Sequence, residues 1–233
     1  MRLRSCSAAA MLAATLSSAG PALSSSLVIN GDFSAGNSGF SSDYAFRSPI
    51  NGETQYNVVP GKHINDSSSN SYGDWTAITS DPSGGNGNVL IANGATSPGE
   101  RVWDESVSVK PFTNYVFSFY AADVNYTSAS NADILASING TALGSPLATT
   151  QSWQSASYNW SSGKLSGGVT LALIDTNTQA AFNDFALDFI SMSPAVSSTP
   201  LPAALPLFVS SLGIAGAALW RRRRVRQCSV AGA

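Results

Sequence analysis

The chain has 233 residues, of which only 11% are charged, and its formal net charge is −2 at pH 7. Residues 27–198 carry all fourteen acidic side chains but only five of the twelve basic ones, so this part has a net charge of −9. Such a surface repels nucleic acid and anionic lipid, which excludes both as partners of this part of the chain. Both cysteines, Cys6 and Cys228, lie outside residues 27–198, so a domain there contains no disulfide.

Residues 1–26 have the layout of a secretory signal peptide. Arg2 and Arg4 form a short basic region, residues 8–16 are mostly Ala, Leu and Met, and small residues follow. We expect cleavage after Ala22, with Ala19 and residues 24–26 as alternatives. The layout predicts that the chain is exported.

Residues 27–193 show the pattern of short β-strands separated by Gly, Asn, Ser and Pro. Apolar side chains recur at every second position in 115–121 and 169–173, and again at Phe185, Leu187 and Phe189, which should share one face. Asn139-Gly140 lies between two apolar runs and predicts a tight type I′ hairpin. No stretch keeps a helical period for three turns. The pattern predicts an all-β domain, an antiparallel β-sandwich.

Residues 60–88 are polar and rich in glycine, which predicts long loops around one short strand at 75–78. Binding sites for sugars combine exposed aromatic rings with hydrogen-bonding side chains. The candidates here are Trp75 and Tyr72, with Asn70 and Asp74 to fix hydroxyl groups. Burial of these aromatic side chains in the core is the alternative.

Trp153 is a further candidate for carbohydrate binding. It belongs to the stretch "WQSASYNW", in which Ala156, Tyr158 and Trp160 occupy one face of a strand and Trp153 falls on the other. We therefore expect Trp160 in the core and Trp153 outside it. Trp103 shares a face with Val107 and is also expected to be buried.

The sequence offers little for catalysis. His63 is the only histidine, and it lies in the polar segment, so Ser-His-Asp and Cys-His arrangements lack a base. No HExxH, CxxC or glycine-rich phosphate loop is present. A glycosidase needs two converging carboxylates, and the sequence does not pair any. We therefore predict no catalytic residue, and a glycoside-active enzyme is the less favoured alternative.

The C-terminal end has three parts. A short Pro-rich motif is followed by an uncharged span at 203–220, about 27 Å long as a helix, which nearly matches a hydrocarbon core of about 30 Å. An arginine cluster at 221–226 then keeps this end cytoplasmic and the preceding domain outside. Residues 194–199 are the expected linker and 227–233 the expected cytoplasmic tail. The motif is Pro200, Leu201, Pro202 and Ala203, and the residues that set the orientation are Arg221, Arg222, Arg223 and Arg224.

This three-part end, residues 200–226, resembles the PEP-CTERM class of bacterial sorting signals, in the variant whose motif reads Val-Pro-Leu-Pro-Ala. Thr199 stands where valine is usual, and a tail from Val225 to Ala233 extends past the run of four arginines. The resemblance implies as partners the secretion machinery and an exosortase, a membrane protease that recognises the motif. It also implies transfer from the inner membrane to the cell surface or extracellular matrix.

The stretches "LVINGDFSAG", "GNGNVLIANGATSPGERVW" and "NDFALDFISMS" resemble carbohydrate-binding-module-like domains of the galactose-binding jelly-roll superfamily. The resemblance implies a jelly roll over residues 27–193, with the first and last strands close together and a structural calcium near their junction. The candidate ligands are Asp32, Asp184 and Asp188, although Ser34 occupies a position where glutamate is common. Calcium takes six to eight oxygens, so the alternative that these aspartates face solvent or cap turns stays open.

Together these features predict an exported, non-catalytic protein of the cell surface or extracellular matrix that binds or accompanies carbohydrate, with polysaccharide as a partner. A purely structural matrix protein without a ligand is the alternative. A measurable affinity for a glycan separates the two.

Overall fold

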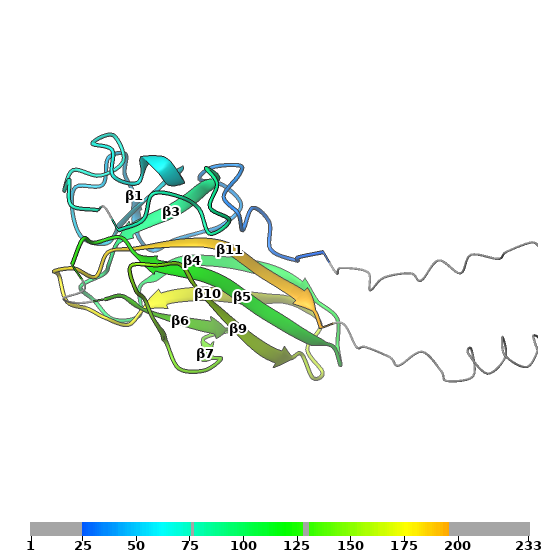
Figure 1. Ribbon diagram of the computed structural model, residues 1–233. Coiled ribbons are helices and arrows are strands. Elements are labelled where there is room, and N and C mark those ends of the chain that lie inside the picture. Colours follow the sequence, from blue (N-terminus) through cyan, green and yellow to red (C-terminus); the bar gives the residue numbers. More distant parts are fainter. Residues whose placement is uncertain (1–24, 76, 128–130, 196–233) are drawn as a thin grey trace, which may run out of the picture. The chain divides into compact units, whose positions relative to one another are not determined.

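The computed structural model describes residues 25–75, 77–127 and 131–195, which belong to one compact unit (Figure 1). Residues 1–24 of the predicted signal peptide, the sorting motif, the C-terminal apolar span and the arginine cluster lie outside the described residues. Within the described ranges, no helix is both long and apolar enough to cross a membrane. Apart from one 3-10 turn at Gly61–His63, the described regular structure consists of β-strands.

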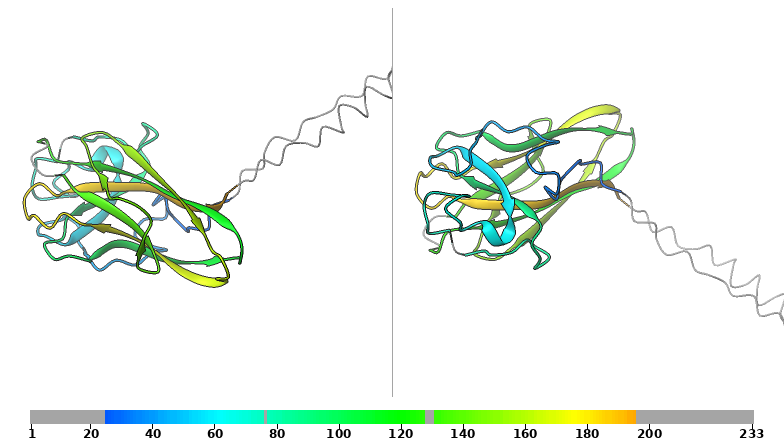
Figure 2. Two further views of the ribbon diagram at one scale, coloured as in Figure 1. Left: turned by 90° about the horizontal axis from the view of Figure 1, so that it is seen from below. Right: turned by 90° about the horizontal axis from the view of Figure 1, so that it is seen from above.

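Two sheets form the domain, and all strand pairs are antiparallel except the pair of β1 and β2, so the predicted all-β sandwich is confirmed (Figures 1 and 2). The six-stranded sheet has the order β1 (Ala45–Phe46), β2 (Gln55–Pro60), β3 (Asn88–Asn93), β11 (Phe185–Pro194), β5 (Asn114–Asp123), β9 (Gln154–Ser161). The five-stranded sheet has the order β4 (Arg101–Val109), β10 (Gly167–Asp175), β6 (Asp133–Ile138), β7 (Thr141–Ala142), with β8 (Leu147–Ala148) also paired to β6.

The inter-sheet core is built from every second residue of the central strands. In β5, Tyr115, Phe117, Phe119 and Ala121 point into it, as their spacing predicts. The opposite sheet fills this core with Val169, Leu171 and Leu173 of β10 and with Trp103 and Val107 of β4. Trp160 packs against the margin of the core. Burial of these large apolar side chains is the main favourable term in the stability of a domain without disulfides.

The predicted hairpin is present. Asn139 and Gly140 form the two-residue connection between β6 and β7, with φ of 49° and 75°. A type I′ turn needs positive φ at both central residues, which glycine and asparagine adopt most readily. This local signal is sufficient to fix the register of the pair.

A second core covers part of the outer face of the six-stranded sheet. Val89 and Ile91 of β3 point outward, and residues of the polar segment 60–88 fold over them. The predicted strand at 75–78 is absent from the described residues of this segment, because Trp75 and Ile78 fill a hydrophobic cluster from irregular backbone. The members of this outer core are Ile50, Val59, Ile64, Trp75, Ile78, Val89, Ile91, Ala122, Val124 and Ala186.

The beginning of the domain runs along its last strand, as the resemblance implies. The Leu27 N–H donates to the Met192 carbonyl at 2.6 Å, and the Ile190 N–H donates to the Gly31 carbonyl at 2.8 Å. A Cβ atom at Gly31 would lie 1.9 Å from the Ile190 carbonyl oxygen, so only glycine permits this approach. The NGDF stretch is thereby held against the middle of β11.

Candidate functional site

A β-bulge interrupts β11 where it passes beside the NGDF stretch. Asp188 pairs with Tyr120 of β5 and Ser191 pairs with Ser118, so Phe189 and Ile190 both stand opposite Phe119. Phe189 has a φ of 47°, a left-handed conformation that costs a non-glycine residue about 1–2 kcal/mol. The bulge turns Phe189 to the outer face, where it is 39% exposed, and sends Ile190 into the inter-sheet core. The prediction that Phe189 shares the buried face of Phe185 and Leu187 is therefore wrong.

Asp188 holds the bulge in place. Its Oδ1 accepts a hydrogen bond from the Phe189 N–H at 2.7 Å, and the residue is only 1% exposed. Burial raises the pKa of the Asp188 carboxyl to about 8; the Phe189 N–H opposes this rise, whereas the carboxylates of Asp81 and Asp32 add to it. The Asp188 carboxyl therefore accepts the backbone N–H of Phe189, a residue of the bulge.

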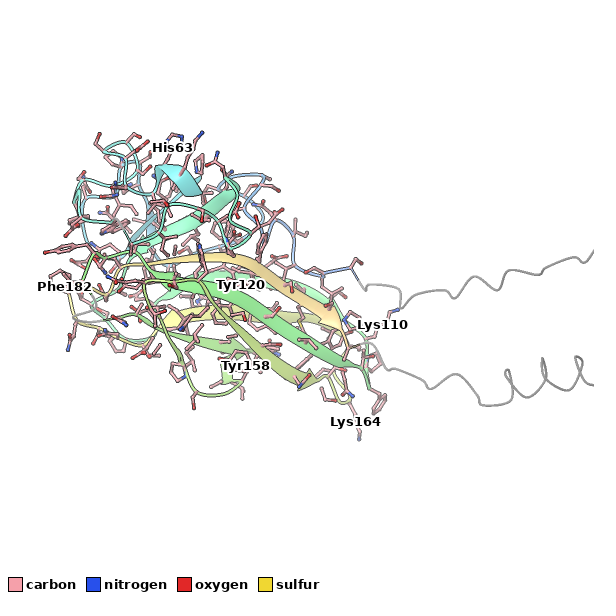
Figure 3. The ribbon with its side chains drawn as sticks, viewed as in Figure 1. His63, Lys110, Tyr120, Tyr158, Lys164 and Phe182 are labelled. Atoms are coloured by element: carbon pink, nitrogen blue, oxygen red, sulfur yellow. The ribbon has the colours of Figure 1, made fainter. Side chains whose placement is uncertain are left out.

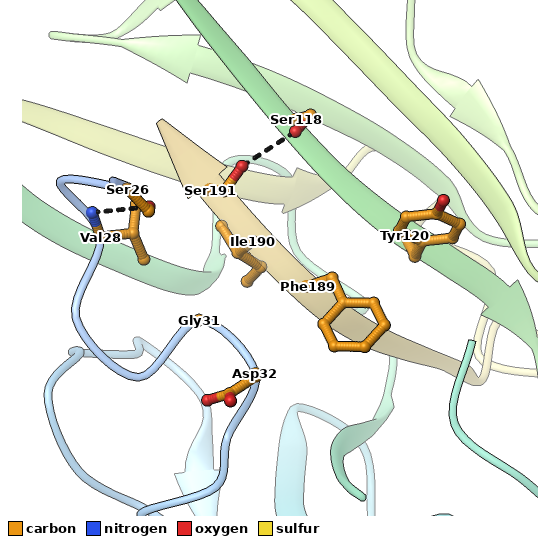
Figure 4. A pocket seen from close by; sticks show the side chains of 9 residues that line it. All are labelled: Ser26, Val28, Gly31, Asp32, Ser118, Tyr120, Phe189, Ile190 and Ser191. Atoms are coloured by element: carbon orange, nitrogen blue, oxygen red, sulfur yellow. Dashed lines mark hydrogen bonds between the residues drawn. The ribbon is translucent and has the colours of Figure 1, made fainter. Parts of the chain in front are cut away.

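The outward ring of Phe189 meets Tyr120, which is 36% exposed, and the two centroids are 6.0 Å apart at an interplanar angle of 80°. Figure 4 shows both rings beside an open pocket, with Asp32 on the neighbouring loop. The pocket has a volume of about 460 Å³ and is lined by Ser26, Val28, Gly31, Asp32, Ser118, Tyr120, Phe189, Ile190 and Ser191. Two exposed rings that meet edge to face offer an apolar surface with polar groups at its border.

Hydroxyl groups border the two rings. The Ser118 and Ser191 hydroxyls are 3.1 Å apart in adjacent strands (Figure 4). Ser157 and Ser155 of β9 stand directly opposite Ser118 and Tyr120, and both are exposed. The only charged residue in β5 and β9 is Asp123, at the end of β5. This half of the outer face is therefore an uncharged surface of hydroxyls and aromatic rings, with Asp32 at its margin.

The residues predicted from the loop segment do not form an exposed aromatic platform. Trp75 is 0% exposed and belongs to the outer core, so its predicted exposure is wrong. Tyr72 is 43% exposed and stacks on Trp75, with centroids 5.7 Å apart and an interplanar angle of 15°. Asn70 is buried. Its side-chain oxygen accepts hydrogen bonds from the backbone N–H groups of Tyr72 and Gly73, and its side-chain nitrogen donates one to the Ile64 carbonyl. Asn70 therefore stabilises the loop.

Two further candidates occupy other places. Trp153 is half-buried against the outer core and donates from Nε1 to the Ser80 carbonyl at 2.9 Å, which agrees with its predicted position opposite Trp160. Asp74 is half-buried in the loop next to Trp75. The structure therefore leaves Tyr72 as the exposed aromatic side chain of the predicted set, and neither Asn70 nor Trp75 faces solvent beside it.

The three aspartates predicted to bind calcium do not come together. Asp184 precedes Asp188 by four residues, about 13 Å along an extended chain, which is too far for one ion. Asp188 lies within electrostatic reach of Asp32, whereas Asp184 lies near Glu53 and Asp74. Across the described ranges, no group of three His, Cys, Asp or Glu side chains is placed to hold a metal ion. Asp32 therefore lies near Asp188 and Asp184 has other neighbours, and the binding of calcium stays a prediction.

Sequence reasoning missed Tyr120 and Phe189 as site residues, although one signal in the sequence marks Phe189. The apolar period in "FALDFISM" changes phase, because Phe185, Leu187 and Phe189 occupy odd positions and Ile190 and Met192 occupy even ones. A change of phase inside one strand indicates an extra residue. It therefore indicated that one of the two adjacent apolar residues would face outward.

No protein-family model matches the chain, and no match was found among curated proteins. Several solved structures are similar to it. They include a xylan-binding domain, CBM22-1 of Xyn10C from Paenibacillus barcinonensis (18% identity, 48% of this chain and 74% of that one, TM-score 0.37). They also include a module titled Family 16 Carbohydrate Binding Module-2 (16% identity, 71% and 98%, TM-score 0.42). A third is the Stig cyclase Fisc from Fischerella sp. TAU (11% identity, 76% and 100%, TM-score 0.48). At these identities and TM-scores, none of these likenesses assigns a function to the chain.

Proposed function

We propose that the protein is a non-catalytic carbohydrate-binding protein and that it binds neutral glycans on the outer face of the six-stranded sheet, at Tyr120 and Phe189. The observation that carries the proposal is the bulge of β11. It holds an aromatic residue in a strained conformation and exposes its ring to solvent beside a second exposed ring. Strained residues persist only where the surrounding structure holds them, and they concentrate at functional sites.

The chemistry of this face fits a sugar ring. A pyranose has an apolar C–H face and a rim of hydroxyl groups, which matches aromatic rings beside serine hydroxyls and the Asp32 carboxylate. The surface is open and shallow, so we expect a Kd on the order of 0.1–1 mM, about −4 to −5.5 kcal/mol. β5 and β9 contain no basic side chain, and the net charge of −9 on residues 27–198 repels anions, so we expect neutral glycans to bind better than acidic ones.

Isothermal titration with a panel of neutral and acidic polysaccharides tests this function. The Tyr120→Ala variant should lose most of the affinity for any neutral glycan that the parent binds. Tyr126→Ala is the matched control, since Tyr126 is 60% exposed and does not line the pocket, and it should bind like the parent. Equal binding by Tyr120→Ala and the parent would place the glycan elsewhere. A parent that binds no glycan would favour the scaffold alternative.

The proposal includes the location of the protein. Export by residues 1–26 and recognition of Pro200–Ala203 by an exosortase-type protease would bring the domain to the cell surface or matrix, where polysaccharide is present. In the unprocessed precursor, Arg221–Arg224 would keep the tail cytoplasmic. A reporter fused after Ala233 should therefore stay in the cytoplasm, and its export would contradict this orientation.

A further inference from the structure

One end of the domain is formed by two loops that connect the two sheets. Residues 110–113 join β4 to β5, and residues 162–166 join β9 to β10. The last described residue also lies at this end, because the Ala195 N–H donates to the Asn114 carbonyl at 2.8 Å, directly after the first of these loops. We call this the exit end, since the chain leaves the domain here on its way to the C-terminal segment.

Hydrogen bonds hold the two loops together. The Phe112 N–H donates to the Gly163 carbonyl, and the Ser162 N–H donates to the Thr113 carbonyl at 3.0 Å. Ser162 is buried, and its hydroxyl donates to the Lys110 carbonyl at 2.7 Å and accepts the Thr113 N–H at 3.0 Å. The backbone of the exit end is therefore ordered, and its exposed side chains project from fixed positions.

Two large apolar side chains are exposed at this end. Phe112 is 77% exposed, the highest value among the large hydrophobic side chains of the described residues, and Leu165 is 50% exposed. Phe112 follows Pro111 in its turn and has a φ of 53°, a conformation that glycine or asparagine ordinarily supplies. The ring of Phe112 therefore occupies an unfavourable backbone position and gains little burial within the domain. An apolar partner outside the domain would account for both features.

The charge of the exit end is opposite to that of the domain as a whole. Lys110 and Lys164 are exposed there (Figure 3), and no acidic residue occurs in the adjoining stretches 106–122 and 155–174. The nearest acidic residue along β4, Glu105, precedes Lys110 by five residues, about 17 Å, which is about two Debye lengths at physiological salt. The net charge of −9 is therefore largely screened at this end. The exclusion of anionic lipid that follows from the net charge does not extend to the exit end.

We propose that the exit end contacts the surface of a lipid bilayer with anionic headgroups, with Phe112 and Leu165 in the interfacial region and the two lysines at the phosphates. Exposed apolar side chains beside basic ones are the combination that binds such surfaces. The inference rests on the proposed membrane anchor. Only seven residues, 196–202, separate Ala195 from the apolar span at 203–220, about 25 Å of extended chain. An anchored domain therefore stays within reach of the bilayer, and the tether begins at its exit end.

Spin labels on the full chain, reconstituted into lipid vesicles, test this contact. With Cys6 and Cys228 replaced by serine, one label is attached at Leu165→Cys and a control label at Tyr126→Cys, which follows the opposite end of β5 and is 60% exposed. Oxygen concentrates in lipid and a nickel complex stays in water, so their relative effects on the relaxation of each label report which phase surrounds it. In vesicles with about 30% anionic lipid, the label at residue 165 should report lipid and the label at residue 126 should report water.

Replacement of the lysines tests the role of charge. Lys110→Ser and Lys164→Ser should each lower the ratio of contacting to free domains about fivefold, because one basic residue near an anionic surface contributes about this factor. Lys62→Ser is the matched control, since Lys62 is exposed but lies in the loop segment outside the exit end, and it should keep the ratio of the parent. Phe112→Ser should lower the ratio without any change of charge.

Flotation of the vesicles shows separately whether the chain is anchored. A chain that floats while its label at residue 165 reports water overturns the lipid contact and leaves the proposed location standing. A chain that does not float overturns both. Shielding of this label from oxygen and nickel alike, with broadening between labels, would show a second copy at the exit end and overturn the lipid contact, as would equal contact by a variant that lacks both lysines. Glycan affinity is measured on its own and does not depend on any of these results.

Discussion

The strain at Phe189 can be measured by comparison of two substitutions. Phe189→Ala removes the ring but leaves a Cβ atom on a residue whose φ is 47°. Phe189→Gly removes the same ring and also the Cβ atom, so the left-handed conformation becomes favourable. The difference between the two variants therefore isolates the backbone strain from the loss of the ring.

The expected difference in unfolding free energy between the two variants follows from three contributions. Both variants lose the edge-to-face pair with Tyr120, which is worth about 0.5–1.5 kcal/mol beyond its buried area. The glycine variant then recovers about 1–2 kcal/mol of left-handed strain. It also loses about 0.5–1 kcal/mol to the greater entropy of unfolded glycine. Phe189→Gly should therefore be more stable than Phe189→Ala by about 0.5–1 kcal/mol, or about 1–4 °C in melting temperature for a domain of this size.

Thermal and urea unfolding of both variants would measure this difference. Tyr120 supplies the matched control, because it lies in the regular part of β5 and lacks a positive φ. There glycine should be less stable than alanine by about 0.5–1 kcal/mol, the opposite sign. If Phe189→Ala were the more stable variant of its pair, the bulge would not be strained, and the main support for a functional role of Phe189 would disappear.

Two further predictions concern buried groups. Trp75→Ala should destabilise the protein by about 3–5 kcal/mol in urea unfolding, because it empties the centre of the outer core, and an effect below about 1 kcal/mol would contradict the burial of Trp75. Burial raises the pKa of Asp175 to about 7, so the folded state holds a proton that the unfolded state loses above about pH 4. Stability should therefore fall as pH rises from about 4 to 7, by up to about 1.4 kcal/mol per pH unit, and Asp175→Asn should flatten this slope in melts across the range.

Much of the sandwich could be predicted because its signals are local. Apolar and polar side chains alternate in β5 and β10 because one face of each strand packs in the inter-sheet core. Asn139-Gly140 forms its hairpin turn through backbone preferences that need no distant contact. The proximity of the chain start to β11 came from the resemblance, and hydrogen bonds of Leu27 and Ile190 support it.

The outer face could not be predicted because distant residues decide it. Trp75 lies in a polar, glycine-rich stretch, which favours an exposed loop. Its burial depends on Val89 and Ile91, whose outward side chains need a cover that strand periodicity alone does not reveal. The grouping of Asp184 with Glu53 likewise depends on which strand ends meet, and residues far apart in the sequence reach one edge only through the sheet order.

The two halves of this outer face differ in a way that favours a function for Phe189. Over β2 and β3, apolar side chains are covered by loops, so burial stabilises the fold there. Beside β5 and β9, Tyr120 and Phe189 stay 36% and 39% exposed among the described residues, and Phe189 keeps an unfavourable backbone conformation. The bulge places Ile190 in the inter-sheet core, which contributes to folding stability, but burial of Ile190 does not require an exposed aromatic ring at position 189. The proposed recognition of a ligand by Phe189 and Tyr120 would account for that ring.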